Sequence, residues 1–256
     1  MVNTVTNDLN NRLSDSTIFI SASIPDPERW KGSFDRLGIT DAVVAVARAV
    51  LQNGGKLVTA AHPTIAPLLL YVATEHLGKY KIATEQLGES DTATEQPEES
   101  DTATEQPEER DQRIIVYQSR AFEDVLPVET KRYQDKGIGE INWTDRIGDE
   151  PPDPKFAPRS LKKMRCQMLT ESKPVAAVFI GGMKGISDEY NLFHKLYRAA
   201  PVYAFSRPGG EARKLVGKSP EKLQPELAKS DVYSTLARYI VNDIASKVSK
   251  SAEPSK

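Results

Sequence analysis

Five short apolar runs, separated by amphipathic segments, are the feature that most constrains the fold of this chain. Runs this continuous are typical of strands buried on both faces of a parallel sheet. The segments between them carry apolar residues at helical spacing. This order predicts a Rossmann-like, doubly wound α/β fold with a mainly parallel sheet and helices on both faces. The predicted strands are Thr17–Ser21, Lys56–Ala60, Arg113–Tyr117, Val175–Ile180 and Val202–Phe205, and the predicted helices are Asp41–Gln52, Thr64–Leu77, Val128–Asp135, Ser160–Leu169, Ser187–Ala199 and Asp231–Lys247.

An acidic repeat interrupts this order. Three tandem ten-residue units that share Ala-Thr-Glu-Gln occupy residues 81–110. From 78 to 111 the chain has 11 acidic and 3 basic residues, a net charge of −8, and few large apolar side chains. Such a composition predicts a solvated loop. We therefore expect one domain over residues 17–248, interrupted by the loop at 78–111, with a flexible N-terminus at 1–16 and a flexible tail at 249–256.

Composition excludes several classes of protein. No apolar stretch reaches the roughly 20 residues that span a bilayer, and residues 1–16 lack the apolar core of a signal peptide, so a cytoplasmic protein without membrane contact is expected. The single Cys166 cannot form an internal disulfide. The histidines, at 62, 76 and 194, are too scattered for a zinc site, and no metal is expected. Without the acidic loop the chain carries +6, but no dense basic stripe favours a nucleic-acid partner.

A glycine-rich turn follows the fourth apolar run and leads into a helix. Glycines let the backbone approach a ligand and adopt positive φ, while the first N–H groups of a helix point toward bound negative charge. The pattern predicts a phosphate-sized anion site, although glycine can also simply turn the chain between strand and helix. The residues expected to line it are Gly181, Gly182, Met183, Gly185 and Ile186.

Polar and small residues also follow the other predicted strands. In parallel sheets the ligand crevice lies beyond the carboxyl ends of the strands, so these positions are candidates for ligand contact. Arginines there suit phosphate, and a histidine can act as a base or a donor. The alternatives are ordinary turn chemistry, exposed arginines and a histidine that merely begins a helix. The candidates are Ser21, Ala22, Ser23, His62, Gln118, Ser119, Arg120, Arg207, Gly209 and Gly210.

Glu189 is the carboxylate nearest the glycine turn and the candidate catalytic residue. It could cap the free N–H groups of its helix. Alternatively, it could face a bound ribose and stabilise the positive charge that develops when an N-glycosidic bond breaks.

Several of these motifs resemble the SLOG superfamily, which groups SMF/DprA proteins with LOG proteins. The resemblance rests on Ser21-Ala-Ser-Ile-Pro after the first strand, on Gly-Gly-x-x-Gly-Ile-x-x-Glu at 181–189, and on Arg-Pro-Gly-Gly at 207–210. It implies a Rossmann-like sheet with a glycine-rich nucleotide site. LOG enzymes cleave nucleoside monophosphates, whereas other branches bind NAD-derived signals in antiviral defence.

The glycine motif departs from the LOG signature Pro-Gly-Gly-x-Gly-Thr-x-x-Glu. Phe179-Ile180 precedes the glycines, one residue is inserted, and Ile186 stands where the signature has threonine. These departures favour binding over hydrolysis. The expected function is binding or sensing of a nucleotide-derived ligand such as NAD, ADP-ribose or cyclic ADP-ribose, in bacterial antiviral defence.

Two other functions stay open from the sequence. One is an N-glycoside hydrolase that acts on nucleotides, of the LOG phosphoribohydrolase or NAD-cleaving type, and the other is an interaction scaffold that displays the acidic repeat. The candidate partners are the nucleotide-derived small molecule, an effector protein and further copies of the chain.

Overall fold

A six-stranded, all-parallel sheet forms the centre of the protein. The computed structural model describes residues 11–14, 16–60, 62–76, 113–126, 128–135, 139–153, 155 and 157–252. The strand order is β4-β3-β2-β1-β5-β6. This confirms the predicted Rossmann-like, doubly wound α/β fold. The strands are β1 (Thr17–Ser23), β2 (Lys56–Thr59), β3 (Ile114–Ser119), β4 (Glu140–Thr144), β5 (Ala176–Gly181) and β6 (Val202–Ala204).

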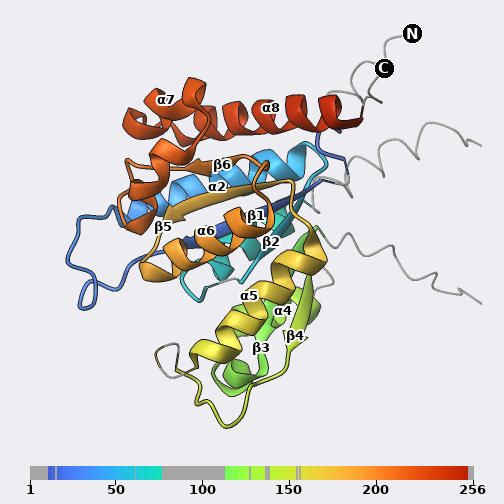
Figure 1. The fold of residues 1–256 in the computed structure, drawn as a ribbon, viewed down its shortest axis with the longest axis vertical. Coiled ribbons are helices and arrows are strands. Elements are labelled where there is room, and N and C mark those ends of the chain that lie inside the picture. Colours follow the sequence, from blue (N-terminus) through green and yellow to red (C-terminus); the bar gives the residue numbers. More distant parts are fainter. Residues whose placement is uncertain are drawn as a thin grey trace, which may run out of the picture.

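Helices cover both faces of the sheet. Residues from α2, α8 and a helix over residues 66–76 pack together against one face, and residues from α5, α6 and η2 pack against the other. Figure 1 shows α8, in red, at the β6 end of the molecule, while β4 and α4 lie at the opposite end. No described helix combines the length and apolar character that a membrane crossing requires. The bounds are α2 (Arg36–Gln52), η1 (Arg120–Val125), α4 (Val128–Asp135), α5 (Pro158–Ser172), α6 (Lys184–Leu196), η2 (Glu211–Lys218), η3 (Glu221–Leu223), α7 (Gln224–Lys229) and α8 (Tyr233–Ala252).

The central strand β1 shows why the apolar runs are continuous. Successive side chains of a strand point to opposite faces of its sheet. Ile18 and Ile20 therefore join the cluster formed with α2 and α8, while Phe19 joins the cluster formed with α5 and α6. Phe19 meets Phe179 of β5 edge to face, with ring centroids 5.9 Å apart. Because both faces are covered, every position in this part of the strand is apolar.

The edge strand β4 was not predicted from the sequence. Its residues, Glu-Ile-Asn-Trp-Thr, read as a polar segment between Pro127 and the proline-rich stretch at 151–158. Edge strands are short and only partly covered, so they do not need a continuous apolar run. In contrast, the short helix predicted at Val128–Asp135 is confirmed as α4.

Both ends of the described chain differ from the bounds expected from the sequence. Leu13 lies in the predicted flexible N-terminus, yet its side chain is fully buried and its N–H donates to the Asn53 carbonyl over 2.8 Å. Helix α8 continues to Ala252, past the expected end of the domain at residue 248. The acidic loop predicted at 78–111 lies outside the described residues.

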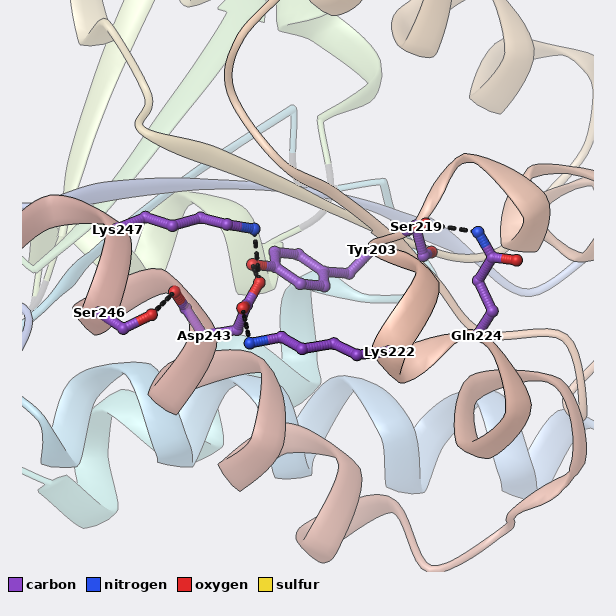
Figure 2. Close-up of polar contacts among 7 residues, drawn as sticks. All are labelled: Tyr203, Ser219, Lys222, Gln224, Asp243, Ser246 and Lys247. Carbon is purple, nitrogen blue, oxygen red and sulfur yellow. Dashed lines mark hydrogen bonds and ion pairs between the residues drawn. The ribbon is translucent and has the colours of Figure 1, made fainter. Parts of the chain in front are cut away.

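Helix α8 is joined to the sheet by a buried carboxylate. The Tyr203 hydroxyl donates to Asp243 over 2.6 Å, and Lys222 and Lys247 each form an ion pair with Asp243 at 2.6 Å (Figure 2). Tyr203 is fully buried, whereas both lysine side chains extend toward solvent. Burial alone would raise the pKa of Asp243, but its hydrogen bonds to Lys222, Lys247 and Tyr203 lower it below the ordinary value. The cluster thus connects β6, η3 and α8.

Candidate functional site

The predicted glycine turn lies where the order of the strands reverses. From β1, the chain adds β2, β3 and β4 on one side of the sheet and β5 and β6 on the other. In open α/β sheets this reversal is where ligands bind, beyond the carboxyl ends of the strands. Ser23 is paired with Gly181 at that edge. The candidates Ser21, Ala22 and Ser23 therefore form the last three residues of β1 and adjoin the glycine turn.

The two glycines of the turn are required by its geometry. Gly181 and Gly182 have φ values of 62° and 68°, in the left-handed region that favours glycine. A Cβ atom on Gly182 would lie 2.3 Å from Cγ1 of Ile186. The N–H of Gly182 donates to the Ser23 carbonyl over 2.7 Å. Gly182 therefore shapes the turn, and its N–H is engaged within the protein.

The donors available to an anion come one step later in the chain. Helix α6 begins at Lys184 with Met183 as its N-cap residue, and the Ile186 N–H donates to the Met183 carbonyl over 2.9 Å. The first N–H groups of an α-helix have no intrahelical acceptor. The N–H groups of Lys184 and Gly185 can therefore bind an anion, whereas the side chain of Ile186 is buried and packs in the core.

Glu189 is the centre of a polar cluster on the first turns of α6. Its carboxylate accepts a hydrogen bond from the Ser21 hydroxyl over 2.5 Å and another from Nε of Arg165 over 2.9 Å. The Glu189 side chain is 11% exposed and the Arg165 side chain 20% exposed. Glu189 is the sixth residue of α6 and lies beyond its first turn, so it does not cap the helix as the sequence allowed. The carboxylate is instead engaged by side chains from β1 and α5.

Arg165 belongs to the candidate site although the sequence did not reveal it. Its Nη2 atom lies 3.1 Å from the position that a Cβ atom on Gly185 would take, so the guanidinium reaches the first turn of α6. The sequence of the predicted helix does not single out Arg165, because Lys162 and Lys163 on the same helix are basic as well.

The loop before α5 holds the helix that carries Arg165. The Glu150 carboxylate accepts the backbone N–H groups of Arg159 and Ser160 over 3.1 and 2.7 Å, and so caps the N-terminus of α5. Burial alone would raise the pKa of Glu150, but the hydrogen bonds from Ser160 and Arg159 lower it to about 2. A carboxylate at a helix N-terminus is also favoured by the helix dipole. The cap therefore stabilises the helix that brings Arg165 to the site.

His62 follows β2 and lies within electrostatic reach of Glu189. Burial lowers the pKa of His62, and the negative charge of Glu189 raises it by a smaller amount. The residue nevertheless remains exposed to solvent. Its Nδ1 atom contacts Thr64, which also accepts the Ile24 N–H through its hydroxyl oxygen over 3.0 Å. The loops that follow β1 and β2 are thereby joined beside the Glu189 cluster.

The second glycine pair, Gly209 and Gly210, lies next to the glycine turn, and Gly210 packs against its backbone. Gly209 and Gly210 have φ values of 78° and 71°. A Cβ atom on Gly210 would lie 2.5 Å from the carbonyl carbon of Gly181, and one on Gly209 would lie 2.4 Å from the Ser33 oxygen. Close packing on neighbouring backbone therefore accounts for both glycines, and ligand contact by either stays a prediction.

Glu211 connects this support to α6. Its N–H donates to the Gly182 carbonyl over 2.8 Å, and its carboxylate accepts the Ser187 hydroxyl over 2.7 Å. Lys214 lies 2.7 Å from the same carboxylate. Burial would raise the pKa of Glu211, but Lys214 and Ser187 lower it. One residue thus ties the turn to the helix that follows it.

Gln118 and Ser119 have structural partners at the end of β3. The Gln118 amide donates to the Ala60 carbonyl over 2.5 Å, which joins the ends of β3 and β2. The Ser119 hydroxyl accepts the Ala121 N–H over 3.3 Å and caps η1, and Ser119 is fully buried. The structure therefore gives both residues a place at the edge of the sheet, but not beside the glycine turn.

The two candidate arginines lie apart from the Glu189 cluster. Arg120 pairs with Glu123 at 3.1 Å and lies over the ring of Trp143, 5.5 Å from its centre. Three strand spacings of about 4.8 Å separate β3 from β5, or about 14 Å. Arg207 is 4.0 Å from Asp231, near the start of α8, and its side chain is 62% exposed. Neither arginine contacts the residues around Glu189 in this structure.

Among the described residues, no three histidine, cysteine or acidic side chains lie close enough together to hold a metal ion. The candidate site instead offers backbone N–H groups, one guanidinium, one carboxylate, hydroxyls and an imidazole. This set suits a ligand that carries both an anionic group and hydroxyl groups.

Comparison with known proteins connects this site to a family. No curated protein matches the chain. A family model described as the SLOG cluster3 family matches residues 100–240, which is more than half of the chain. The matched region runs from before β3 into α8 and contains Arg165, the glycine turn and Glu189, while Ser21 and His62 lie before it. Together with the Rossmann-like sheet, the match shows that this chain belongs to the SLOG cluster3 family.

Proposed function

We propose that this protein binds and senses a nucleotide-derived ligand of the NAD, ADP-ribose or cyclic ADP-ribose type at the edge of the sheet between β1 and β5. The observation that carries the proposal is the meeting of the α6 N-terminus, Arg165, Glu189 and Ser21 where the strand order reverses. A place in bacterial antiviral defence, with an effector protein that responds to the bound state, is part of the same proposal and agrees with the family resemblance.

The spacing of the groups suits a ribose phosphate. The N–H groups of Lys184 and Gly185 and the guanidinium of Arg165 would hold the phosphate. Glu189 lies five residues beyond Lys184, which corresponds to about 7.5 Å along a helix. A carboxylate at that distance can accept hydrogen bonds from ribose hydroxyls, and Ser21 can supply a further polar contact. The phosphate would therefore meet N–H and guanidinium donors, and the ribose hydroxyls would meet a carboxylate and a hydroxyl group.

The proposal predicts a rise in the thermal midpoint of the protein when the right ligand is added. A panel of NAD, ADP-ribose, its cyclic isomers and nucleoside monophosphates should contain at least one compound that stabilises the fold. A ligand at 100 times its Kd contributes about 2.7 kcal/mol, which corresponds to about 5 to 10 °C for a protein of this size. If the midpoint stays constant for every compound at millimolar concentration, the proposal is wrong.

A matched pair of variants on α5 tests where the ligand binds. Arg165→Met should weaken binding about 10- to 100-fold, because a charge-assisted hydrogen bond contributes about 1.5–3 kcal/mol. Lys162→Met removes an exposed charge of the same sign from the same helix and should leave the Kd nearly unchanged. The double variant Arg165→Met with Glu189→Gln removes both charges of the pair, so that neither is left buried without a partner. Weak binding by this variant would therefore not be due to misfolding.

A second candidate function is hydrolysis of an N-glycosidic bond in the bound nucleotide. It is favoured by the placement of Glu189, which is largely buried and held between Ser21 and Arg165. A carboxylate in that position could stabilise positive charge on the ribose as the base leaves. Arg165 would meanwhile neutralise the phosphate.

The hydrolase candidate makes a separate prediction. Wild-type protein incubated with NAD or AMP should release nicotinamide or adenine, measured by chromatography, and Glu189→Gln should lower the rate by at least about 100-fold, as loss of one essential carboxylate does. The thermal midpoint of Glu189→Gln shows whether the variant is folded. Absence of released base from wild-type protein that binds the nucleotide would reject hydrolysis and leave the binding proposal intact.

A further inference from the structure

We infer that His62 is a neutral hydrogen-bond donor to the ligand through its Nε2–H, and that Thr64 is the positioning residue that selects this tautomer. The role toward a ligand rests on the proposed function. The tautomer itself is a property of the free protein, so the two can be tested separately.

The backbone of Thr64 determines which ring nitrogen carries the lone pair. The Thr64 N–H donates to Nδ1 of His62 over 3.3 Å. A backbone N–H can only donate, so Nδ1 must act as the acceptor. In a neutral imidazole the proton then resides on Nε2.

The Thr64 hydroxyl reinforces the same tautomer. Its oxygen accepts the Ile24 N–H over 3.0 Å, and it lies 3.0 Å from Nδ1 of His62. Because Nδ1 already accepts the Thr64 N–H, the hydroxyl, whose oxygen accepts from Ile24, can donate its own proton to the same ring nitrogen. Two donors can thus converge on Nδ1, and a proton on that atom would conflict with the Thr64 N–H.

The backbone around His62 holds the ring in place. The His62 carbonyl accepts the N–H groups of Ile65 and Ala66 over 2.7 and 3.0 Å, at the start of the helix over 66–76. His62 therefore begins this helix and caps it through Nδ1, which agrees with the structural alternative considered from the sequence. That role occupies one side of the ring only, and Nε2 is left for another partner.

Partial desolvation of the ring by neighbouring protein atoms favours its neutral form, although the residue as a whole is exposed to solvent. This desolvation lowers the pKa of His62, and the opposing effect of Glu189 is smaller. Glu189 is itself paired with Arg165, so its charge is partly balanced before it reaches the imidazole. The neutral ring with its proton on Nε2 is therefore the form expected at neutral pH.

This assignment limits the chemistry of His62. A nitrogen that already carries a proton cannot take one from water, so His62 does not serve as the general base of a hydrolytic reaction. It can donate to an acceptor oxygen, such as a phosphate oxygen or a ribose hydroxyl. Any hydrolysis would then depend on Glu189.

Nitrogen NMR of the full-length protein tests the tautomer directly. In the free protein, the ¹⁵N shifts of His62 should be pyridine-like for Nδ1 and pyrrole-like for Nε2. The rings of His76 and His194 serve as internal comparisons. Thr64→Val keeps the backbone N–H and removes the hydroxyl, so it should move the His62 shifts toward a mixture of tautomers without changing the other two rings. A pyrrole-like Nδ1 in the wild-type protein would overturn the inference.

Two replacements of His62 test the donor role, with ADP-ribose as the probe. Glutamine can place its amide N–H near the position of Nε2, whereas asparagine can reach only the position of Nδ1. His62→Gln should retain the wild-type Kd within about threefold, and His62→Asn should weaken binding about 3- to 10-fold, as loss of one hydrogen bond does. Equal Kd values for the two variants would reject the donor role. If ADP-ribose does not bind wild-type protein, the proposed ligand class fails for this probe, while the NMR shifts still decide the tautomer.

Discussion

Gly210→Ala is expected to destabilise the protein by about 3 kcal/mol or more. Gly210 has φ of 71° and ψ of −167°, a conformation open essentially to glycine alone, which costs another residue about 1–3 kcal/mol. The added Cβ would also lie 2.5 Å from the carbonyl carbon and 2.8 Å from the Cα of Gly181. Because these are backbone atoms, no side chain can rotate to relieve the contact. The glycine turn itself must move.

Gly210→Ala should reduce ligand affinity more strongly than it reduces the stability of the fold. A displaced Gly181 shifts the start of α6 and with it the N–H groups of Lys184 and Gly185, so ligand affinity should be lost even where the variant still folds. Chemical denaturation measures the first effect, and ligand titration below the melting temperature measures the second. Gly217→Ala is the matched control, since its Cβ would meet nothing within 4 Å. If both variants unfold at the same denaturant concentration, the close packing of the two glycine turns is not what stabilises this region.

Asp243→Ala is expected to lower the free energy of unfolding by about 2–3 kcal/mol. The main cause is the Tyr203 hydroxyl, which is fully buried and would lose its acceptor, at a cost of about 1–3 kcal/mol (Figure 2). Lys222 and Lys247 contribute less, because their side chains are 66% and 43% exposed and can turn to water. The thermal midpoint should fall by roughly 4 to 10 °C.

Two further variants separate the contributions within this cluster. Asp243→Asn keeps an acceptor for Tyr203 and should cost less than Asp243→Ala. The pair Tyr203→Phe with Asp243→Ala removes both partners and should be more stable than Asp243→Ala alone. If Tyr203→Phe does not reduce the cost of Asp243→Ala, the hydroxyl is not the reason for the loss.

The same cluster predicts how stability depends on acid. The pKa of Asp243 is lower in the folded protein than its ordinary value of 3.8. Between the two pKa values the unfolded chain binds more protons, so stability rises with pH in that range. The contribution of Asp243 should be complete above about pH 4 and disappear as pH falls through the folded pKa. The difference in thermal midpoint between wild type and Asp243→Asn should therefore be constant near neutral pH and should decrease toward zero below pH 4.

Local patterns predicted the parts of the structure that depend on neighbours in sequence. Strands covered on both faces need a continuous apolar run where they are covered, and such runs made β1 and β5 predictable. The glycine turn was visible because positive φ favours glycine. Strand β4 was not predicted, because an edge strand is only partly covered and does not need a continuous apolar run.

Distance along the chain explains what could not be predicted at the site. The candidate residues were chosen because they follow strands, and this rule placed Ser21, His62 and the glycine turn at one edge of the sheet. The rule does not say which strands are neighbours. Arg120 satisfied it equally well, but β3 lies on the far side of β2 and β1 from the glycine turn.

The sequence by itself determined the alternation of strands and helices, the glycine turn and the position of Glu189 on the helix that follows it. Only the tertiary structure decided that Ser21, 168 residues before Glu189, and Arg165, 24 residues before it, meet its carboxylate. The reason is physical: helix and turn signals arise from interactions between near neighbours, whereas the partners of a buried charge are set by strand order and by the packing of one helix on another.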